Sequence, residues 1–429
     1  MTRRELMRGA ASAALPSFAQ AQSSGRPSDA YRNYFGDLHN HNDVGYAQGS
    51  LTRSFEVARN HLDFYAFTPH SYWPDVGHYD GKIENKWKHG FAVAKARWPD
   101  VVELARQYDE PGEFVTILGY ERHGAAEGDY HILFPDLAGD YELIEDLREL
   151  QAFAKRRGCI MVPHHLQTGS ATAHFVDQHR RLVSPVLEIY SEWGNAEHDR
   201  APRPYKRHTE GGRWTKHTLH SYLEQGHRLG VVASTDDHLG YPGGYREGLA
   251  VIKATELSRD SIFDALRARR CYAVSGDRIA LDFELNGAMM GSELPYARER
   301  RMRVAVRGWD QVDRVEILKN NRVIHRDFRW IAKPRRELKP PRAGAPSTAG
   351  ALAGARLGRH GGLGFSAKRR GRKITKQRPA SPPARSMSFA ATASSSATRA
   401  AFACSRSPRS NSKSTTGRRG DRATRGRRR

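Results

Sequence analysis

The stretch Tyr34-Phe35-Gly36-Asp37-Leu38-His39-Asn40-His41 joins a short apolar segment to two histidines that are two residues apart. In an extended backbone, side chains two residues apart point to the same side, so both imidazoles can face a single ion. Imidazole is a common ligand of zinc and iron. This stretch therefore predicts a β-strand that ends at a metal site.

The same succession of a short strand and a metal-binding side chain recurs along the chain. Apolar or β-branched runs predict strands at 34–38, 64–68, 114–118, 131–134, 159–162, 186–190, 230–233 and 249–252. Potential ligands at or near the ends of these strands are His39, His41, His70, Glu121, His131, His164, His165, Asp236 and His238. In barrels and open α/β sheets the carboxyl ends of the strands gather at one face, where active sites form. We therefore expect these side chains to share one pocket.

Helices are predicted between the strands. Apolar residues return at three- and four-residue spacing at 88–108, 142–157, 218–229 and 257–269. This alternation of strand and helix over about 250 residues predicts a parallel sheet, either open or closed into a barrel.

After Arg278 the apolar pattern changes to a period of two, which indicates antiparallel strands. Alternation occurs at 279–285 and 302–306, and 315–317 is expected to pair with 323–324 across a turn at Asn320 and Asn321. About four strands fit before residue 330, fewer than the roughly seven of a β-sandwich. A small, truncated antiparallel β domain is therefore expected at 279–330.

Charge is distributed unevenly along the chain of 429 residues, which has 70 Lys and Arg, 47 Asp and Glu, and a net charge of +23. Residues 331–429 hold 26 basic and two acidic residues, whereas residues 1–330 hold 44 basic and 45 acidic ones. The body is thus nearly neutral, which disfavours a fold that binds nucleic acid over its whole surface. No apolar run approaches the roughly 18 residues that cross a bilayer, so no membrane span is expected.

The segment 331–429 is rich in Arg, Ala, Ser, Gly and Pro and contains no Val, Tyr or Trp. Such a composition cannot build a core, so a disordered basic low-complexity tail is expected. Three interpretations stay open, in this order: a gene read out of frame, a solvated or linker tail, and a basic arm that binds nucleic acid. Only the third makes nucleic acid a partner.

The first residues, Thr2-Arg3-Arg4, precede a mildly apolar run and the small-residue segment Ala19-Gln20-Ala21. This order resembles a twin-arginine export signal at 1–21, which implies a periplasmic or exported protein. The alternative is a short disordered leader in which the arginines occur by chance.

Many imidazoles with a few carboxylates suit zinc, manganese or iron better than calcium or magnesium. The number of potential ligands indicates two or three divalent ions. Taken in order, Leu38-His39-Asn40-His41, Thr68-Pro69-His70-Ser71, Glu121, Pro163-His164-His165 and Asp236-Asp237-His238 resemble the motifs of the PHP domain, a family named for polymerases and histidinol phosphatases. The resemblance covers about residues 31–278.

Three further segments look like a bacterial PHP branch of uncharacterised function whose members have a C-terminal β domain. They are Phe35-Gly36-Asp37-Leu38-His39-Asn40-His41, Glu188-Ile189-Tyr190-Ser191 and residues 270–278. The resemblance implies a distorted (β/α)7 barrel at 31–278, with a cluster of two or three metals that hydrolyses phosphoesters.

The resemblance also implies which residues hold the metals. His39, His41, Glu121 and Asp236 would hold one part of the cluster, His70, His131 and His164 the rest, and His238 would complete it. In this family a further histidine often follows the first pair, and here Asp43 occupies that neighbourhood. His165 is an alternative to His164 as the ligand.

A phosphoesterase of this kind attacks phosphorus with a hydroxide that bridges two metals, so no protein nucleophile is needed. A proton donor to the leaving oxygen would assist, and Asp43, His123, His165 and His198 are candidates by their chemistry. The expected substrate is small and phosphorylated, with phosphomonoesters and phosphodiesters both open.

Other functions stay open. The first is a metal-dependent amidohydrolase, in which the same cluster attacks a carbonyl. Against it, none of the predicted strands ends in the lysine that the related superfamily uses to bridge its metals. The others are a non-catalytic metal-binding protein and an inactive relic of an enzyme.

Overall fold

The computed structural model describes residues 30–75, 81–124, 127–167, 183–206, 217–308, 312–328, 389–395 and 399–401. The expected export signal at 1–21 and most of the expected tail lie outside these ranges. Among the described residues, no helix has the length and apolar character that crossing a membrane requires.

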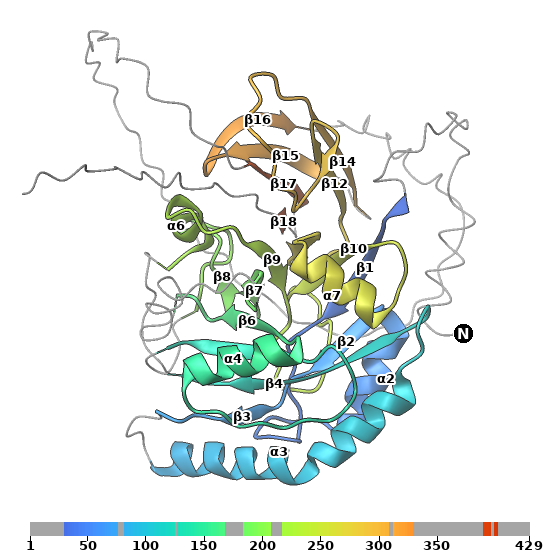
Figure 1. Ribbon diagram of the computed structural model, residues 1–429, viewed down its shortest axis with the longest axis vertical. Coiled ribbons are helices and arrows are strands. Elements are labelled where there is room, and N and C mark those ends of the chain that lie inside the picture. Colours follow the sequence, from blue (N-terminus) through green and yellow to red (C-terminus); the bar gives the residue numbers. More distant parts are fainter. Residues whose placement is uncertain are drawn as a thin grey trace, which may run out of the picture. The chain divides into compact units, whose positions relative to one another are not determined.

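The largest sheet has twelve strands within the described part of the chain (Figure 1). They are β1 (Arg32–Asp37), β2 (Phe64–Phe67), β3 (His70–Tyr72), β4 (Val115–Arg122), β5 (Asp129–Leu133), β6 (Ile160–His164), β10 (Leu249–Ala254), β11 (Cys271–Val274), β15 (Val312–Lys319), β16 (Arg322–Phe328), β17 (Phe389–Ser395) and β18 (Arg399–Ala401). Their order is β16-β15-β17-β18-β11-β10-β1-β2-β4-β5-β6, and β3 pairs with β4. Every residue of β2 to β6 is buried, as in a sheet covered on both faces.

The expectation of a parallel sheet is only partly right. The pairs β1/β2, β2/β4 and β3/β4 are parallel. The pairs β1/β10, β10/β11, β4/β5 and β5/β6 are antiparallel. The connection between β4 and β5 at 123–128 is too short for a crossover helix, so β5 must return in the opposite direction. The sheet is therefore mixed.

A second sheet contains β7 (Val186–Ser191), β8 (Gly194–Asn195) and β9 (Gly230–Ala233), with β7 and β9 parallel. Two backbone hydrogen bonds join it to the first sheet: Asp236 N–H donates to the His39 carbonyl at 2.8 Å, and His41 N–H donates to the Asp237 carbonyl at 3.0 Å. The strands curl into a half-barrel (Figure 1). No ladder joins β6 to β7 among the described strands, so the fold is mixed α/β and a closed (β/α)7 barrel is not confirmed.

The described helices include α2 (Leu51–His61), α3 (Gly81–Tyr108), α4 (Leu147–Arg157), α6 (Leu219–Glu224) and α7 (Arg259–Arg267). The apolar patterns above do not predict α2. Helix α4 begins later than the predicted residue 142 because the Asp146 carboxylate caps it, accepting from the backbone N–H groups of Arg148 and Glu149. It ends at Gly158, whose φ of 76° suits a glycine at a helix end.

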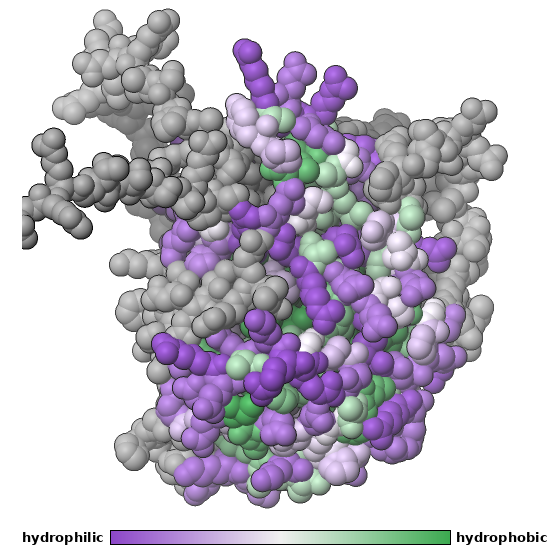
Figure 2. All heavy atoms as spheres, in the orientation of Figure 1, coloured by the Kyte–Doolittle hydropathy of each residue, from purple (hydrophilic) through white to green (hydrophobic). Residues whose placement is uncertain are grey.

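The core lies on both faces of the curled sheet. Along β2, Tyr65 and Phe67 belong to one cluster of buried apolar side chains, and Phe64 and Ala66 belong to another. Successive strand residues point to opposite faces, so this division shows that both faces are packed. Figure 2 shows that the described surface on one side is mostly hydrophilic, with small separate apolar areas.

The period-two region forms β-structure. Strands β12 (Ala280–Leu285), β13 (Ala288–Met289) and β14 (Met302–Arg307) make a third sheet. Strands β15 and β16 form the predicted hairpin, and Asn320 and Asn321 have the positive φ values of 52° and 61° that a two-residue turn requires. The hairpin and its turn are confirmed, but the register differs from the expectation: residues 315–317 pair with 325–327, and Val323 pairs with Leu318.

Strands β17 and β18 differ from the expectation of a tail without regular structure. Strand β17 pairs with β15, and β18 pairs with β11, both antiparallel. The sequence of β17 contains no charged residue, proline or glycine. Its backbone can therefore form ladder hydrogen bonds with the exposed edge of β15. The rest of the tail lies outside the described residues.

Gly36 allows β1 to approach β2. A Cβ atom at this position would lie 2.3 Å from ring atoms of the buried Phe64. We expect Gly36→Ala to lower the free energy of unfolding by about 1–3 kcal/mol, because the ring has to move within a packed core. Urea unfolding measures this loss. The alanine should cost less in a Phe64→Leu background, and an equal cost in both backgrounds would contradict the explanation.

Candidate metal centre

The structure brings all eight predicted metal ligands together. His39 and His41 follow β1, His70 opens β3, Glu121 lies in β4, His131 in β5 and His164 at the end of β6, and Asp236 and His238 follow β9. They contribute to overlapping groups in which the potential ligand atoms lie within 4.8 Å of one another. All are buried except His238, whose side chain is 29% exposed. The open side of the cluster is therefore at His238.

Glu121 lies at the centre of this cluster. Its Oε1 atom is 2.7 Å from His164 Nε2. Its Oε2 atom is 3.6 Å from His39 Nε2, 3.4 Å from His41 Nε2 and 3.4 Å from His70 Nε2. One carboxylate thus faces imidazoles from three separate strand ends, as a bridging ligand would.

A second carboxylate, Asp236, faces the first histidine pair. Its Oδ1 atom lies 3.3 Å from His39 Nε2 and 3.1 Å from His41 Nε2. The two Nε2 atoms are themselves 2.9 Å apart. These three side chains form one of the candidate ligand groups.

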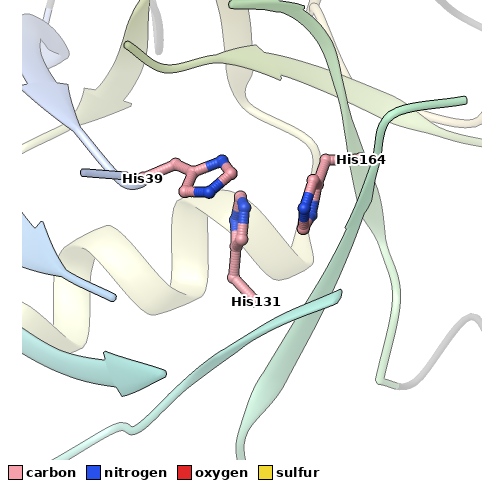
Figure 3. A group of neighbouring side chains, drawn as sticks. All are labelled: His39, His131 and His164. Carbon is pink, nitrogen blue, oxygen red and sulfur yellow. The ribbon is translucent and has the colours of Figure 1, made fainter. Parts of the chain in front are cut away.

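The rings of His39, His131 and His164 point toward one another from β1, β5 and β6 (Figure 3). Their centroids are separated by 3.8 Å for His39 and His131, 4.6 Å for His39 and His164, and 4.2 Å for His131 and His164. These rings form a second candidate group, made only of imidazoles.

A third group, His41, His70 and His238, lies at the exposed end of the cluster. The rings of His41 and His70 are stacked, with centroids 3.7 Å apart. The His238 ring lies 4.5 Å from the first and 5.0 Å from the second. Of these three side chains, His238 is the one that is partly exposed.

Asp37 holds the strand ends in register. Its buried carboxylate accepts hydrogen bonds from the backbone N–H groups of His39 at 3.2 Å, Thr235 at 3.0 Å and Gly243 at 3.0 Å. It also accepts one from the Thr235 hydroxyl at 2.5 Å. Burial raises the pKa of Asp37 to about 6. This one side chain joins the segments that carry His39 and Asp236.

Two of the site residues have left-handed backbone conformations. The φ angles are 51° at His165 and 53° at Asp236, and neither residue is a glycine. Such conformations cost free energy and are retained where the surrounding structure imposes them. His165 directly follows β6, and Asp236 lies three residues after β9. The two side chains meet, with His165 Nε2 3.4 Å from Asp236 Oδ2.

Burial keeps several imidazoles neutral. Burial and the neighbouring rings of His70 and His238 lower the pKa of His41 well below its usual value. Burial also lowers the pKa values of His70 and His131 well below the usual range. Neutral imidazole is the form that binds metal ions.

The acidic groups respond differently. Burial raises the pKa of Asp236 to about 7. Burial also opposes ionisation of Glu121, but the imidazoles of His123, His70 and His164 together outweigh it and hold the pKa of Glu121 well below its usual value. For His39, burial opposes protonation, yet Asp236 and Glu188 raise the pKa well above normal. The carboxylates therefore depend on positive charge beside them.

Several buried donor atoms fit a cation. Among the described residues, the atoms without a hydrogen-bond partner include Nδ1 of His41, His70 and His164, both ring nitrogens of His131, Oε2 of Glu121 and Oδ2 of Asp236. Burying such atoms unpaired costs free energy. Nitrogen and oxygen donors in this mixture suit zinc, manganese or iron. The residues therefore could hold metal ions.

Two of the predicted proton donors lie within the cluster. The His123 ring stacks on His70 with centroids 5.2 Å apart. The His165 Nδ1 atom is 2.7 Å from the Tyr205 hydroxyl, and its Nε2 atom faces Asp236.

The other two candidates lie elsewhere. Asp43 has a side chain that is 49% exposed, and its Oδ1 atom is 3.6 Å from Arg97 Nη1. The His198 ring stacks on His220 with centroids 5.0 Å apart. Neither Asp43 nor His198 belongs to any candidate ligand group of the described residues.

The structure adds residues that the strand-end argument did not single out as ligands. Asp129 belongs to a group with Glu121, His164 and His165. Glu188 Oε2 lies 3.4 Å from His39 Nδ1. Asp129 is two residues before His131 in β5, the same spacing as in the His39 and His41 pair, so the signal was present. Tyr205 lies in a connection and has no comparable signal.

We expect Asp37→Asn to weaken the centre from outside it. The amide replaces one acceptor oxygen by an NH2 group that faces N–H donors, which should lower the free energy of unfolding by about 1–3 kcal/mol. Displacement of His39 and Asp236 should lower zinc affinity by about tenfold or more. Urea unfolding and zinc titration measure the two effects. Unchanged zinc affinity in a folded variant would contradict the assigned role of Asp37.

Comparison with known proteins gives partial matches. A family described as a protein of unknown function, DUF3604, matches residues 243–295. An uncharacterised protein of Chlamydia trachomatis is 33% identical over 263 residues, which are 55% of this chain and 42% of that protein. The chain spans about two fifths of the length of the chlamydial relatives that it matches.

Two solved structures also show a likeness. One is a two-domain protein from Bacteroides vulgatus that contains a predicted PHP-like metal-dependent phosphoesterase, with 17% identity, a TM-score of 0.38, and coverage of 57% of this chain and 65% of that one. The other is Endonuclease Q bound to a DNA duplex with an abasic lesion, with 12% identity, a TM-score of 0.34, and coverage of 55% and 57%. The case for a function therefore depends on this chain's own residues.

Proposed function

We propose that the protein is a metal-dependent hydrolase of phosphoesters. The observation that carries the proposal is the gathering of eight His, Glu and Asp side chains into overlapping ligand groups, with four of the imidazoles facing Glu121. A structural ion needs about four ligands, whereas a hydrolytic centre with two or three ions needs about this many.

The residues of the centre would have the following roles. Glu121 and Asp236 would hold divalent ions together with His39, His41, His70, His131, His164 and His238. Ions held there would supply an activated water and positive charge for the phosphoryl oxygens. The buried carboxylates and imidazoles fix the positions of these charges, and the partly exposed His238 leaves one side open to a substrate.

A metal-dependent amidohydrolase is the second candidate, and the contacts of Lys253 argue against it. The described strand ends at the cluster contribute histidines and carboxylates. The buried lysine of β10, Lys253, donates to Asn33 Oδ1 at 3.0 Å and pairs with Asp282, so its ammonium group is already engaged. It is therefore not placed to bridge metals at the centre.

The proposed substrate is a small phosphorylated molecule, and the proposed location is periplasmic or exported. Support for the substrate is the nearly neutral body, which offers no broad basic surface for nucleic acid. Support for the location is the arginine pair followed by an apolar run and small residues at the N-terminus. Nucleic acid would be a partner only through the basic residues of 331–429.

Removal of Asp236 tests the hydrolytic centre. We expect the full chain to carry two or three zinc, manganese or iron ions and to hydrolyse p-nitrophenyl phosphate or bis-p-nitrophenyl phosphate. Asp236→Ala should lose at least one ion and lower turnover about 100-fold or more, because the ligand pair His39 and His41 loses its shared carboxylate. Metal analysis and the release of p-nitrophenol measure these effects.

The matched control is Asp100→Ala, the same change at a carboxylate that is 59% exposed on α3. It should keep wild-type metal content and turnover. Metal without turnover in the wild type would move the assignment to an amidohydrolase or a metal-binding protein. A folded wild type without metal would overturn the proposal and favour an inactive relic.

The proton donor is proposed to be one of Asp43, His123 and His165. Replacement of the donor should lower kcat for a substrate with a poor leaving group about 100-fold and spare p-nitrophenyl phosphate, whose leaving group needs no proton. Asp43→Asn, His123→Gln and His165→Gln allow the comparison. If none of these variants separates the two substrates, the donor lies outside this set.

A further inference from the structure

Asp129 is a buried carboxylate that the proposed hydrolysis does not use. It is 1% exposed and lies at the start of β5. Its Oδ1 atom accepts a hydrogen bond from the Gly124 N–H at 2.8 Å. Its Oδ2 atom has no hydrogen-bond partner among the described residues. An unpartnered carboxylate oxygen in the interior costs free energy unless a positive charge lies beside it.

Three other donors surround Asp129. Glu121 of β4, His164 of β6 and His165 after β6 each offer an atom, and with Asp129 these atoms all lie within 4.8 Å of one another. All four residues are buried. Two carboxylates this close repel each other in a dry environment, and a cation between them would remove the repulsion. Of the candidate ligand groups, this is the one with four members.

The β-ladders hold these donors in place. Asp129 of β5 lies opposite His164 of β6, and Glu121 of β4 lies opposite His131 of β5. Side chains on neighbouring positions of an antiparallel ladder are fixed in relative position by backbone hydrogen bonds. The donor atoms therefore come from a rigid scaffold, which is what a preformed ion site requires.

His165 is held in a ligand-like orientation. Its backbone has a φ of 51°, and its ring is buried. The Tyr205 hydroxyl lies 2.7 Å from Nδ1, and Nε2 lies on the side of the carboxylates, 3.4 Å from Asp236 Oδ2. A hydrogen bond to one ring nitrogen commonly sets which nitrogen is the ligand.

We propose that Glu121, Asp129, His164 and His165 hold one divalent cation as a closed, structural site. Four protein ligands complete the coordination of a structural ion and leave no position for substrate. A carboxylate can bridge two ions but a neutral imidazole binds one, so the site shares Glu121 with the proposed hydrolytic centre and takes His164 as its own ligand. It rests on the metal-binding part of that proposal and not on phosphoester chemistry. Under this assignment His165 is a ligand and not a proton donor.

A competing source of positive charge is His123. Its Nδ1 atom lies 3.7 Å from Asp129 Oδ1 and 3.7 Å from Glu121 Oε1. A protonated His123 would balance the same carboxylates without an ion. The two arrangements differ in whether replacement of Asp129 changes the metal content of the protein.

Asp129→Asn in the full chain distinguishes them. We expect about one ion fewer per chain than in the wild type by elemental analysis after dialysis. We also expect a lower thermal midpoint in the metal-loaded protein, and little or no difference from the wild type once a chelator has removed the ions. Asp100→Asn, the same change at a carboxylate of α3 that is 59% exposed, should match the wild type in both measurements.

Other outcomes have definite meanings. An unchanged ion count in Asp129→Asn, with a thermal deficit that persists in chelator, would overturn the site and favour the His123 ion pair. If Asp129→Asn does not fold, His165→Gln replaces it and should also lose one ion; a full ion count with lowered turnover would make His165 a proton donor and overturn the site. A wild type without metal would overturn both proposals, whereas a wild type with metal and an unaltered Asp129→Asn overturns only this one.

Discussion

The rest of the centre depends on one constraint, which is the charge of the buried Glu121 carboxylate. Its two oxygens lie between 2.7 and 3.6 Å from imidazole nitrogens of His39, His41, His70 and His164. A carboxylate out of water is tolerated only when positive charge or hydrogen-bond donors surround it. His41 and His70, whose pKa values are lowered by burial, are neutral and cannot supply that charge. His39 Nε2 and His41 Nε2 are 2.9 Å apart. The unshared electron pairs of two nitrogens this close repel each other unless a proton or a cation lies between them.

The fold keeps these mutually repelling groups together by attaching them to buried strands. Strand β1 approaches β2 closely at Gly36, where a side chain would collide with Phe64. Asp37 then joins the end of β1 to the segments after β9 through bonds to Thr235 and Gly243. The free energy that holds the site together thus comes from the apolar core and from this buried hydrogen-bond network. The site itself lowers the stability of the fold, in part through the left-handed backbone conformations of His165 and Asp236.

Much of the site could be predicted from sequence, because its signal is local. An extended backbone after a strand places His39 and His41 on one face. The left-handed backbone of Asp236 means that spacing alone does not place Asp236 and His238 in the same way. The strand directions were less predictable, since the antiparallel return of β5 depends on the length of a connection. Asp129 shares the two-residue spacing with His131, but a carboxylate at the start of a strand has many ordinary explanations. Tyr205 reaches His165 from a connection, and only the folded chain brings them together.

The distribution of charge within the centre bears on its substrate. The buried carboxylates that face ring nitrogens of the histidines include Glu121, Asp129, Glu188 and Asp236, and two divalent cations would balance these four. The group of His41, His70 and His238 contains imidazoles alone, and it lies at the exposed end. The buried carboxylate that faces it, Glu121 at 3.4 Å from His41 Nε2 and His70 Nε2, is shared with the rest of the centre. A further ion held there would therefore add positive charge beyond what the four carboxylates balance. A phosphoryl group entering from the solvent supplies the missing negative charge, whereas a neutral amide carbonyl does not. Under the proposed function, this charge balance favours a phosphoester over an amide as the substrate.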